Sequence, residues 1–264
     1  PETTGPDTGN SGHLLMKESL LALDRQLGQL KRAGDRDWRK TLDAVFDEPT
    51  LRAIQQLFSR GVLHTLENVL ATGKEANVFR GKTHDGRNRA VKIYRLNTAT
   101  FRKLAPYLDG DPRFPHGGKS HRNRMFTWAQ KEYKNLHLMR AAGARVPRPY
   151  HVHRNLLVMQ YLGWRYRPYP TLRELPPAKP RDFLEQLMDS IGAWQHAGLA
   201  HGDLSEYNVL NVRETPWVID VGQGVPRQHP RFDELHARDI ANIHRWFRKW
   251  LPGLEPGELE TWNM

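Results

Sequence analysis

Three polar side chains, at intervals of five and twelve residues, restrict what this chain can fold into more than any other feature. Asp203 is followed by Asn208, and Asp220 comes twelve residues later. Residues 209–219 have the composition of two short strands joined by a turn. Because a hairpin of this kind brings Asn208 and Asp220 to the same end, we expect these side chains to belong to one site.

This set of side chains suits phosphoryl transfer from ATP. The reaction needs a carboxylate near the acceptor, then an amide and a second carboxylate that hold metal on the phosphates. Protein kinases place Asp, Asn and a further Asp at this spacing. Here Gly202 stands in place of the arginine before the first Asp, and Val221 in place of the phenylalanine after the last. Each residue alone would be an ordinary turn or cap residue, but all three together favour the kinase interpretation.

A glycine turn and a strand lysine predict contacts with the ATP phosphates. The turn Thr72-Gly73-Lys74 lies between two strand-like segments, and Lys92 follows in the apolar strand 89–94. Backbone amides of such a turn face the phosphates, and a lysine ammonium neutralises them. The sequence contains neither the Gly-rich motif of protein kinases nor a P-loop motif. Taken alone, the turn would be a plain hairpin and Lys92 a solvated strand residue.

Two further elements complete the predicted nucleotide site. A helix is predicted over residues 126–142, and Glu132 is its only acidic residue. A kinase needs one helix glutamate to pair with its strand lysine, and Glu132 is the candidate partner of Lys92. The alternative is a surface ion pair with its neighbours Lys131 or Arg140. The apolar strand 155–163 ends in glycine and suits a hinge whose backbone holds adenine.

The remaining composition predicts one main domain with N-terminal additions. Residues 1–12 cannot bury anything and are expected to form a disordered tail. Residues 13–60 contain two helical patterns, the second at 49–60, which we expect to pack on the next lobe. The main domain is predicted over residues 61–264, with an N-lobe at about 61–160 and a C-lobe at about 161–264.

Several segments between these motifs have distinct patterns. Residues 96–124 are irregular, rich in proline, glycine and basic residues, and are expected to order over nucleotide or on a partner, or to be a flexible insertion. Helices are predicted at 181–196 and 239–251, and a proline-rich connector precedes the first of them.

The charge of the chain points to a polyanionic partner. The net charge is +11, from 40 Lys and Arg against 29 Asp and Glu. RNA is the first candidate, with residues 102–124 as the patch, although a general composition effect explains the charge equally well. No stretch approaches 18 consecutive apolar residues, no secretory signal is visible, and cysteine is absent. We therefore expect no membrane span and a cytoplasmic location.

Taken in order, the motifs resemble the RIO family of atypical protein kinases, and its first subfamily most closely. The similar segments are Thr72–Val78, Val91–Arg95, Gly110–Phe114, His201–Asn208, Ile219–Gln223 and Arg238–Ile243. The resemblance covers about residues 50–250, although the family usually has another residue at Gly202 and often serine at Gly222. It implies an α+β, bilobal, protein-kinase-like fold with a small β-rich N-lobe. The C-lobe would be reduced and helical, lacking the usual activation segment and peptide-binding subdomains.

The resemblance also implies roles for individual residues. Asp203, Asp220 and Lys92 would be catalytic, and Asn208 and Asp220 would bind Mg²⁺ or Mn²⁺. The residues that would contact ATP are Thr72, Gly73, Lys74, Glu75, Ala76, Val78, Lys92, Glu132, Met159, Tyr161 and Asn208. The cofactors implied are therefore ATP and a divalent cation.

Three functions follow as hypotheses. The leading one is an ATP- and Mg²⁺-dependent serine/threonine protein kinase that phosphorylates itself, or an ATPase acting through a phosphoaspartate. It would act in maturation of the small ribosomal subunit or a related RNA process. A second is a small-molecule kinase similar to aminoglycoside or choline kinases, for which the chain has few residues to build a substrate lobe. A third is a mainly non-catalytic, ATP-switched assembly factor that binds RNA.

Overall fold

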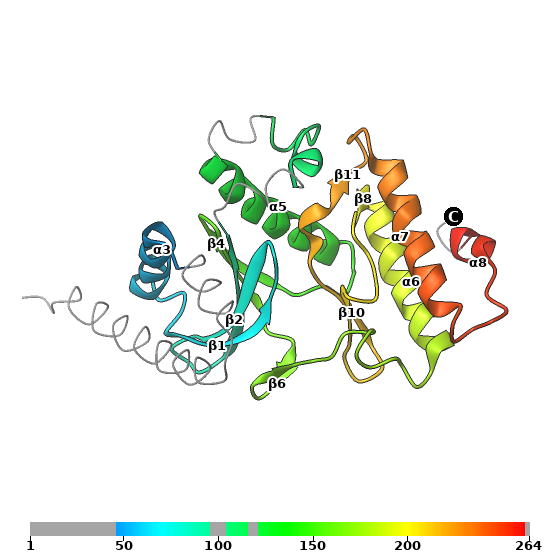
Figure 1. Ribbon diagram of the computed structural model, residues 1–264, viewed down its shortest axis with the longest axis horizontal. Helices are drawn as coiled ribbons and strands as arrows, with labels where there is room; N and C mark the ends of the chain where they lie inside the picture. The colour runs from blue at the N-terminus through cyan, green and yellow to red at the C-terminus, as the bar shows by residue number, and fades with distance from the viewer. Residues whose placement is uncertain (1–45, 96–103, 116–120, 262–264) are drawn as a thin grey trace, which may run out of the picture.

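A computed structural model describes residues 46–95, 104–115 and 121–261 of the chain. Its largest feature is an antiparallel sheet of five strands in the order β1-β2-β3-β5-β4. The strands are β1 (Thr65–Thr72), β2 (Ala76–Lys82), β3 (Asn88–Tyr94), β4 (Pro149–His153) and β5 (Leu156–Gln160). In Figure 1 the sheet lies between helix α3 (Glu48–Ser59) on one side and helix α5 (His121–Ala141) on the other.

The period-two alternation of the central strands sends their side chains to two different cores. On β3, Val91 and Ile93 belong to one apolar cluster, together with Ala53 and Leu57 of helix α3 (Glu48–Ser59). Residues of the other parity, such as Ala90, pack into a second cluster with helix α5 (His121–Ala141). Lys92 shares the parity of Ala90, so its side chain emerges on the α5 side of the sheet.

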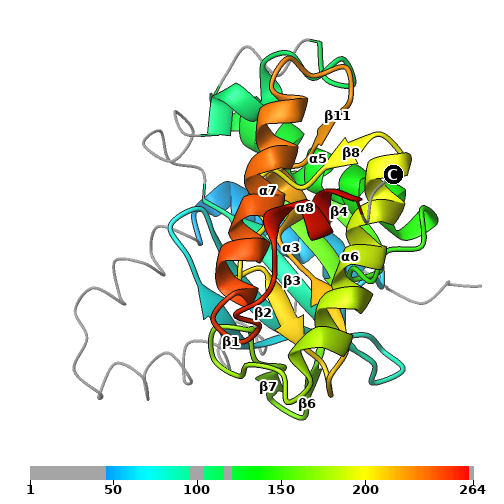
Figure 2. The same ribbon diagram turned by 90° about the vertical axis from the view of Figure 1, so that its right-hand side faces the viewer.

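The rest of the chain is mainly helical. Figures 1 and 2 show helices α6 (Pro180–His196) and α7 (Phe232–Phe247) side by side at the end away from α3, with α8 (Pro256–Thr261) next to them. Two short two-stranded sheets lie between α6 and α7 in the sequence. β8 (Leu199–Ala200) pairs with β11 (Val225–Pro226), and β9 (Val209–Asn211) with β10 (Pro216–Val218), while the 3-10 turn η1 spans Val221–Gln223.

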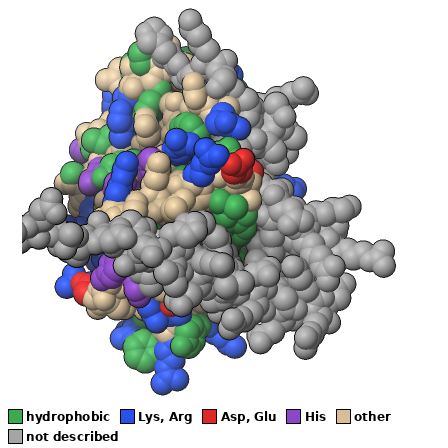
Figure 3. Space-filling view, turned by 90° about the vertical axis from the view of Figure 1, so that its left-hand side faces the viewer, with side chains coloured by type: hydrophobic (Ala, Val, Ile, Leu, Met, Phe, Trp, Pro, Cys, Tyr) green, Lys and Arg blue, Asp and Glu red, His purple; other side chains and the backbone are tan. Residues whose placement is uncertain are grey.

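The proline-rich connector after β5 contains a hairpin that the sequence patterns did not predict. Strands β6 (Gly163–Trp164) and β7 (Arg167–Pro168) pair with one another and form the lowest part of the molecule in Figure 1. At the same height in Figure 3, basic and hydrophobic side chains lie next to each other. Strands of two residues have no hydrophobic period, so no pattern announces them.

The predicted α+β fold is confirmed, with corrections at element ends. Helix α5 begins at His121 instead of 126, and residues 104–108 are helical, so the segment 96–124 is less irregular than predicted. Helix α7 begins at Phe232 instead of 239 and ends at Phe247 instead of 251. The first turn of α5 is polar and carries no apolar stripe, so periodicity places its start too late. In α7 the buried Phe232 and Leu235 continue the apolar face toward the N-terminus, and the sequence prediction missed them.

The predicted hairpin within 209–219 and the helices at 49–60 and 181–196 are found close to their predicted positions. The tail at 1–12 and the first helical pattern of 13–60 lie outside the described residues, and the lobe boundaries stay a prediction. In the described parts of the chain, every helix is too short or too polar to span a membrane.

Candidate active site

Lys92 is the centre of a buried ionic cluster. Its Nζ lies 2.8 Å from Oε2 and 3.0 Å from Oε1 of Glu132, and 2.7 Å from Oδ1 of Asp220. The Glu132 side chain is fully buried, whereas the Asp220 side chain is 51% exposed. The hydroxyl of Tyr94 also donates to Glu132. Three elements far apart in the sequence, β3, α5 and the segment before η1, therefore meet at one ammonium group.

The pKa shifts in this cluster follow from burial and from the ammonium. Burial alone would lower the pKa of Lys92, but the carboxylates of Asp220 and Glu132 outweigh it and raise that pKa. Burial raises the pKa of Glu132 to about 7, although Lys92 opposes the shift. Burial also favours a higher pKa for Asp220, but Lys92 reverses the effect and lowers it. Asp220 is thus held as a carboxylate on the open side of the cluster.

The loop from His201 to Asn208 is held in place by Asp239 on α7. The Asp239 carboxylate accepts hydrogen bonds of 2.8 Å from the backbone amides of Gly202 and Leu204, one to each oxygen. Gly202 has φ of +79°, and a Cβ at this position would lie 2.8 Å from the carbonyl oxygen of Gln223. A glycine is therefore needed here for both reasons. This explains on structural grounds why Gly202 occupies the position before Asp203.

Asp203 has a half-buried side chain with two amide groups against it. Its Oδ2 accepts from Gln223 Nε2 at 3.2 Å and from Asn208 Nδ2 at 3.4 Å, and Asn208 Nδ2 also donates to the Asp203 carbonyl at 2.7 Å. Burial raises the pKa of Asp203, and the charge of Asp220 adds to the rise, while His201 opposes it. A carboxylate with a raised pKa is a better proton acceptor, as a general base needs.

Asn208 and Asp220 are brought together by the β9–β10 hairpin. The amide of Ile219 donates to the Asn208 carbonyl at 2.9 Å, which extends the hairpin by one rung beyond its strands. Asp220 then adopts a left-handed conformation with φ of +60° and ψ of +56°. For a residue other than glycine this conformation is uncommon and costs about 1 kcal/mol or more. The turn breaks the strand direction and aims the Asp220 carboxylate back at Lys92.

The two residues predicted as metal ligands supply oxygen of the kind that Mg²⁺ prefers. Asn208 Nδ2 is occupied by Asp203, which leaves Oδ1 as its acceptor toward a cation. Asp220 supplies an exposed carboxylate. Within the described ranges, no group of three or more His, Asp or Glu is arranged to hold a metal ion alone. A Mg²⁺ ion usually takes only one or two carboxylates and completes its shell with phosphates and water, so the residues fit this ion.

The predicted nucleotide loop is the turn between β1 and β2. Thr72, Gly73 and Lys74 are exposed, and the Gly73 amide donates to the Ala76 carbonyl at 2.9 Å. Glu75 is near enough to the cluster for its charge to affect Glu132. In β2, Ala76 is buried and Val78 pairs with Lys92 across the sheet.

The predicted hinge residues lie in β5 and directly after it. Met159 lies within this strand and pairs with Ala90, and Tyr161 comes directly after the strand. The phenol oxygen of Tyr161 is buried without a hydrogen-bond partner among the described residues. The structure thus brings Lys92, Glu132 and Asp220 into contact, and places Asp203 with Asn208. Thr72 ends β1, Lys74 lies in the turn after it and Met159 lies in β5, and the part that these three residues play in the site stays a prediction.

Several residues of the site carry no signal that spacing alone reveals. Tyr94 contacts Glu132, and Gln223 contacts Asp203. Asp239 contacts the backbone of the 201–208 loop. None of these three residues was predicted as a site residue. Asp239 had a usable signal, because it lies in the Arg238–Ile243 segment that resembles a family signature. Lys131 does not pair with Glu132, which the sequence had left open as an alternative.

Lys131 instead belongs to a second buried network behind the 220–224 segment. Its Nζ lies 3.1 Å from Oδ2 of Asp111 and also donates to the Gly224 carbonyl. Arg113 binds Asp111 through Nε at 2.9 Å and Nη2 at 2.7 Å. Asn135 donates to the carbonyls of Val221 and Gly224 at 2.7 and 2.9 Å. These bonds fasten the segment that carries Asp220 to helix α5.

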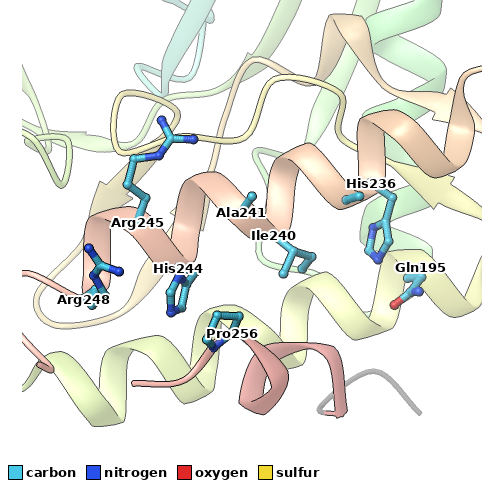
Figure 4. A pocket seen from close by; sticks show the side chains of 9 residues that line it. Gln195, His236, Ile240, Ala241, His244, Arg245, Arg248 and Pro256 are labelled. Carbon is cyan, nitrogen blue, oxygen red and sulfur yellow. The ribbon is translucent and has the colours of Figure 1, made fainter. Parts of the chain in front are cut away.

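One pocket of the structure lies away from these residues. It has a volume of about 580 Å³ and lies between α6, α7 and α8. Figure 4 shows Gln195 and His236 at one end and Arg248 toward the other, with Pro256 of α8 facing α7. None of its lining residues is a carboxylate or belongs to the Lys92 cluster. We therefore assign the active site by side-chain chemistry and not by cavity size.

Comparisons with known proteins agree with this geometry. The model of the RIO domain family matches residues 77–256. The chain is 38% identical to the RIO-type serine/threonine-protein kinase Rio1 of Haloferax volcanii, over 86% of this chain and 78% of that protein. It is 33% identical to the serine/threonine-protein kinase RIO1 of Homo sapiens over 83% of this chain, but it spans only 39% of that longer protein.

The fold also matches a solved kinase. The crystal structure of the Rio2 kinase-ADP/Mg²⁺-phosphoaspartate complex from Chaetomium thermophilum superposes with a TM-score of 0.61. That match has 22% identity and covers 78% of this chain and 61% of that one, and it supports the reduced kinase-like fold. The chain therefore belongs to the RIO family, as a serine/threonine-protein kinase of the Rio1 type.

Proposed function

We propose that this chain transfers the γ-phosphoryl group of ATP, with the Lys92 cluster and the 201–208 loop as its active site. The observation that carries the proposal is the contact of one buried ammonium with both Glu132 and Asp220. Phosphoryl transfer depends mainly on positioning and on stabilisation of charge. Lys92 provides charge for the phosphates, Glu132 fixes the position of Lys92, and the exposed Asp220 carboxylate would hold a cation.

Asp203 is proposed as the residue that orients the acceptor hydroxyl and takes its proton. The hydroxyl oxygen attacks the γ-phosphorus, the bond to the bridging oxygen breaks, and ADP leaves with that electron pair. Bonds from Asn208 and Gln223 fix the Asp203 carboxylate for this role. Asn208 and Asp220 would hold Mg²⁺, which would neutralise charge on the phosphates. We assign Thr72, Gly73 and Lys74 of the β1–β2 turn to the phosphates, and Met159 and Tyr161 to adenine.

An aspartate of this chain is a second candidate acceptor. The solved Rio2 kinase is itself an ADP/Mg²⁺-phosphoaspartate complex. Asp220 is the better candidate here, because its side chain is 51% exposed whereas Asp203 is half-buried and held by two amides. An Asp220 oxygen would attack the γ-phosphorus with release of ADP, and water would then hydrolyse the acyl phosphate. A hydroxylamine-labile label from [γ-³²P]ATP that disappears in Asp220→Asn would support this route.

The main test separates binding from chemistry. Asp203→Ala should lower the phosphorylation rate at least tenfold while ATP still binds, because a general base contributes typically 10²- to 10⁴-fold. Asp220→Asn should weaken ATP binding only when Mg²⁺ is present, because an amide offers the cation less charge. Titrations of ATP with and without Mg²⁺, alongside the rate measurements, test both statements. An Asp203→Ala protein with more than about a tenth of the wild-type rate contradicts the assigned role.

A second candidate function is binding of RNA, within a role in ribosomal small-subunit maturation. The net charge of +11 favours it. The patch predicted at 102–124 lies partly outside the described residues. Binding should weaken steeply between about 50 and 200 mM salt, since 6–10 phosphate contacts would lose roughly 10³- to 10⁵-fold in affinity.

A cytoplasmic location also stays a prediction. A small-molecule substrate is less favoured, because the relatives are named protein kinases.

A further inference from the structure

The β6–β7 hairpin presents two aromatic rings and two arginines to solvent. Trp164 is 65% exposed and Tyr166 is 64% exposed, and both have alternating arginine neighbours, Arg165 and Arg167, which are also exposed. These are among the most exposed large hydrophobic side chains in the described part of the chain. Folding alone does not explain this arrangement, because exposed rings of this size bury little apolar area.

The hairpin is nevertheless fixed to the sheet. Arg80 of β2 is only 4% exposed, and its Nη1 donates to the Arg165 carbonyl at 3.1 Å. The guanidinium lies 4.2 Å from the centre of the Tyr166 ring. Asn68 of β1 donates to the Tyr166 carbonyl at 3.4 Å. Rigid support of an exposed ring lowers the entropy cost of binding something on it.

The turn itself has an uncommon backbone. Only Arg165 and Tyr166 lie between the paired strands, and Arg165 has φ of +53°. An arginine in this region costs about 1 kcal/mol relative to glycine, so the position is not chosen for turn stability. The turn holds the arginine side chain where glycine would be the easier residue.

These features fit a single-stranded nucleic acid better than a protein partner. Bases stack on exposed aromatic rings, and cations beside the rings bind phosphates. Arg80 already lies against Tyr166, so a base stacked on the ring would have a cation close by. Glu67, at the base of the hairpin, is neutralised by contacts with Arg80 and Lys82. The surface therefore offers cationic and aromatic groups together, which an anionic chain of stacking bases matches.

We propose that the β6–β7 hairpin is a stacking platform for single-stranded nucleic acid, with bases on Trp164 and Tyr166 and phosphates on Arg165 and Arg167. The proposal rests on the second candidate function above, RNA binding, and moves its centre away from residues 102–124. It does not depend on phosphoryl transfer.

The test is the affinity of the full chain for fluorescent 12-residue oligouridine and oligothymidine, measured by anisotropy. Trp164→Ala and Tyr166→Ala should each weaken binding by about 5- to 150-fold, the range for loss of one stacked base. Arg165→Gln with Arg167→Gln should lower the slope of log affinity against log salt by about 1.4, because each phosphate contact on a single strand contributes about 0.7. Comparison of the two oligonucleotides shows whether RNA is preferred over DNA.

Matched controls lie just beyond the C-terminal end of α7. Trp250 is 46% exposed, and Arg248 and Lys249 next to it are exposed. Trp250→Ala, and Arg248→Gln with Lys249→Gln, should leave both affinity and salt slope close to the wild-type values. Trp164→Phe and Tyr166→Phe should each keep most of the wild-type affinity, because phenylalanine still offers a ring for stacking. Circular dichroism and melting temperatures of all variants should match the wild type, since the changed side chains are exposed.

The outcomes separate the two proposals. If the wild-type chain binds neither oligonucleotide at about 50 mM salt, where phosphate contacts are strong, RNA binding and the platform both fall. If it binds but the hairpin variants bind as tightly as wild type, or weaken no more than the α7 controls, the platform alone is overturned. In that case the exposed rings would be a docking site for a protein.

Discussion

Removal of the Asp111 carboxylate should destabilise the fold by an amount that depends on pH. Asp111 is 2% exposed and is the only carboxylate recorded against Lys131 and Arg113 in the described residues. Asp111→Ala leaves two buried or nearly buried cations without their anion. Breaking a buried ion pair by loss of one partner costs about 3–5 kcal/mol in general.

The contribution of Lys131 can be worked out separately. Burial lowers its pKa to about 8 from 10.5, against the opposing effect of Asp111. At pH 7 the charged form is therefore favoured over the neutral form by roughly 1 kcal/mol, since pH 7 lies about one unit below that pKa. In Asp111→Ala, Lys131 avoids a larger penalty by losing its proton, so its share of the cost is roughly 1 kcal/mol. The lost hydrogen bonds of Arg113 add about 1.5–3 kcal/mol.

The sign of the pH dependence follows from linkage. Between pH 8 and 10.5 the unfolded chain holds the Lys131 proton and the folded wild type does not. The titration of Lys131 therefore raises the free energy of unfolding of the wild type as pH rises through this range. At pH 9 both proteins fold with neutral Lys131, and its share of the mutational cost disappears. The total cost of Asp111→Ala should thus fall from about 3–4 kcal/mol at pH 7 to about 2–3 kcal/mol at pH 9.

Urea unfolding followed by circular dichroism, at pH 7 and at pH 9, measures these differences. Lys131→Met provides the control, because it removes the titrating group. In the Lys131→Met background, Asp111→Ala should cost the same free energy of unfolding at both pH values. A cost below about 1 kcal/mol at pH 7, or one in the wild-type background that does not change with pH, would refute the reasoning.

Two further predictions concern the 201–208 loop. Asp239→Ala should lower kcat at least tenfold, with a smaller effect on KM for ATP, because two backbone amides of the loop lose their acceptor. Asp239→Asn keeps one acceptor oxygen, so its kcat should lie between that of Asp239→Ala and that of the wild type. Steady-state kinetics of the three proteins decide the order. Because the pKa of Asp203 is raised, the acid limb of kcat/KM should lie above 3.8, the ordinary value, with activity lost as pH falls through it. A profile that stays flat down to about pH 4 would contradict that role.

Local sequence was enough to predict the features that depend on neighbours in the chain. The spacing of Asn208 and Asp220 across a short hairpin predicted their common position, and the bond between Ile219 and Asn208 confirms it. The alternation of β3 likewise determines that Lys92 shares a face with Ala90 and not with Val91. Both depend on strand period and turn length, which a sequence states directly.

Tertiary packing decided the rest. Glu132 lies 40 residues from Lys92, and its pairing was a hypothesis until α5 was seen to pack on the sheet. Asp111 and Asp239 both lie in segments that resemble family signatures, but the local sequence does not say which groups they bind. Asp111 pairs with Lys131, and Asp239 accepts from the backbone of the 201–208 loop, because a buried charge takes whichever partner the folded backbone brings near. The β6–β7 hairpin was missed for a related reason. Its two-residue strands carry no period, and its position is set by Arg80 reaching from a neighbouring strand.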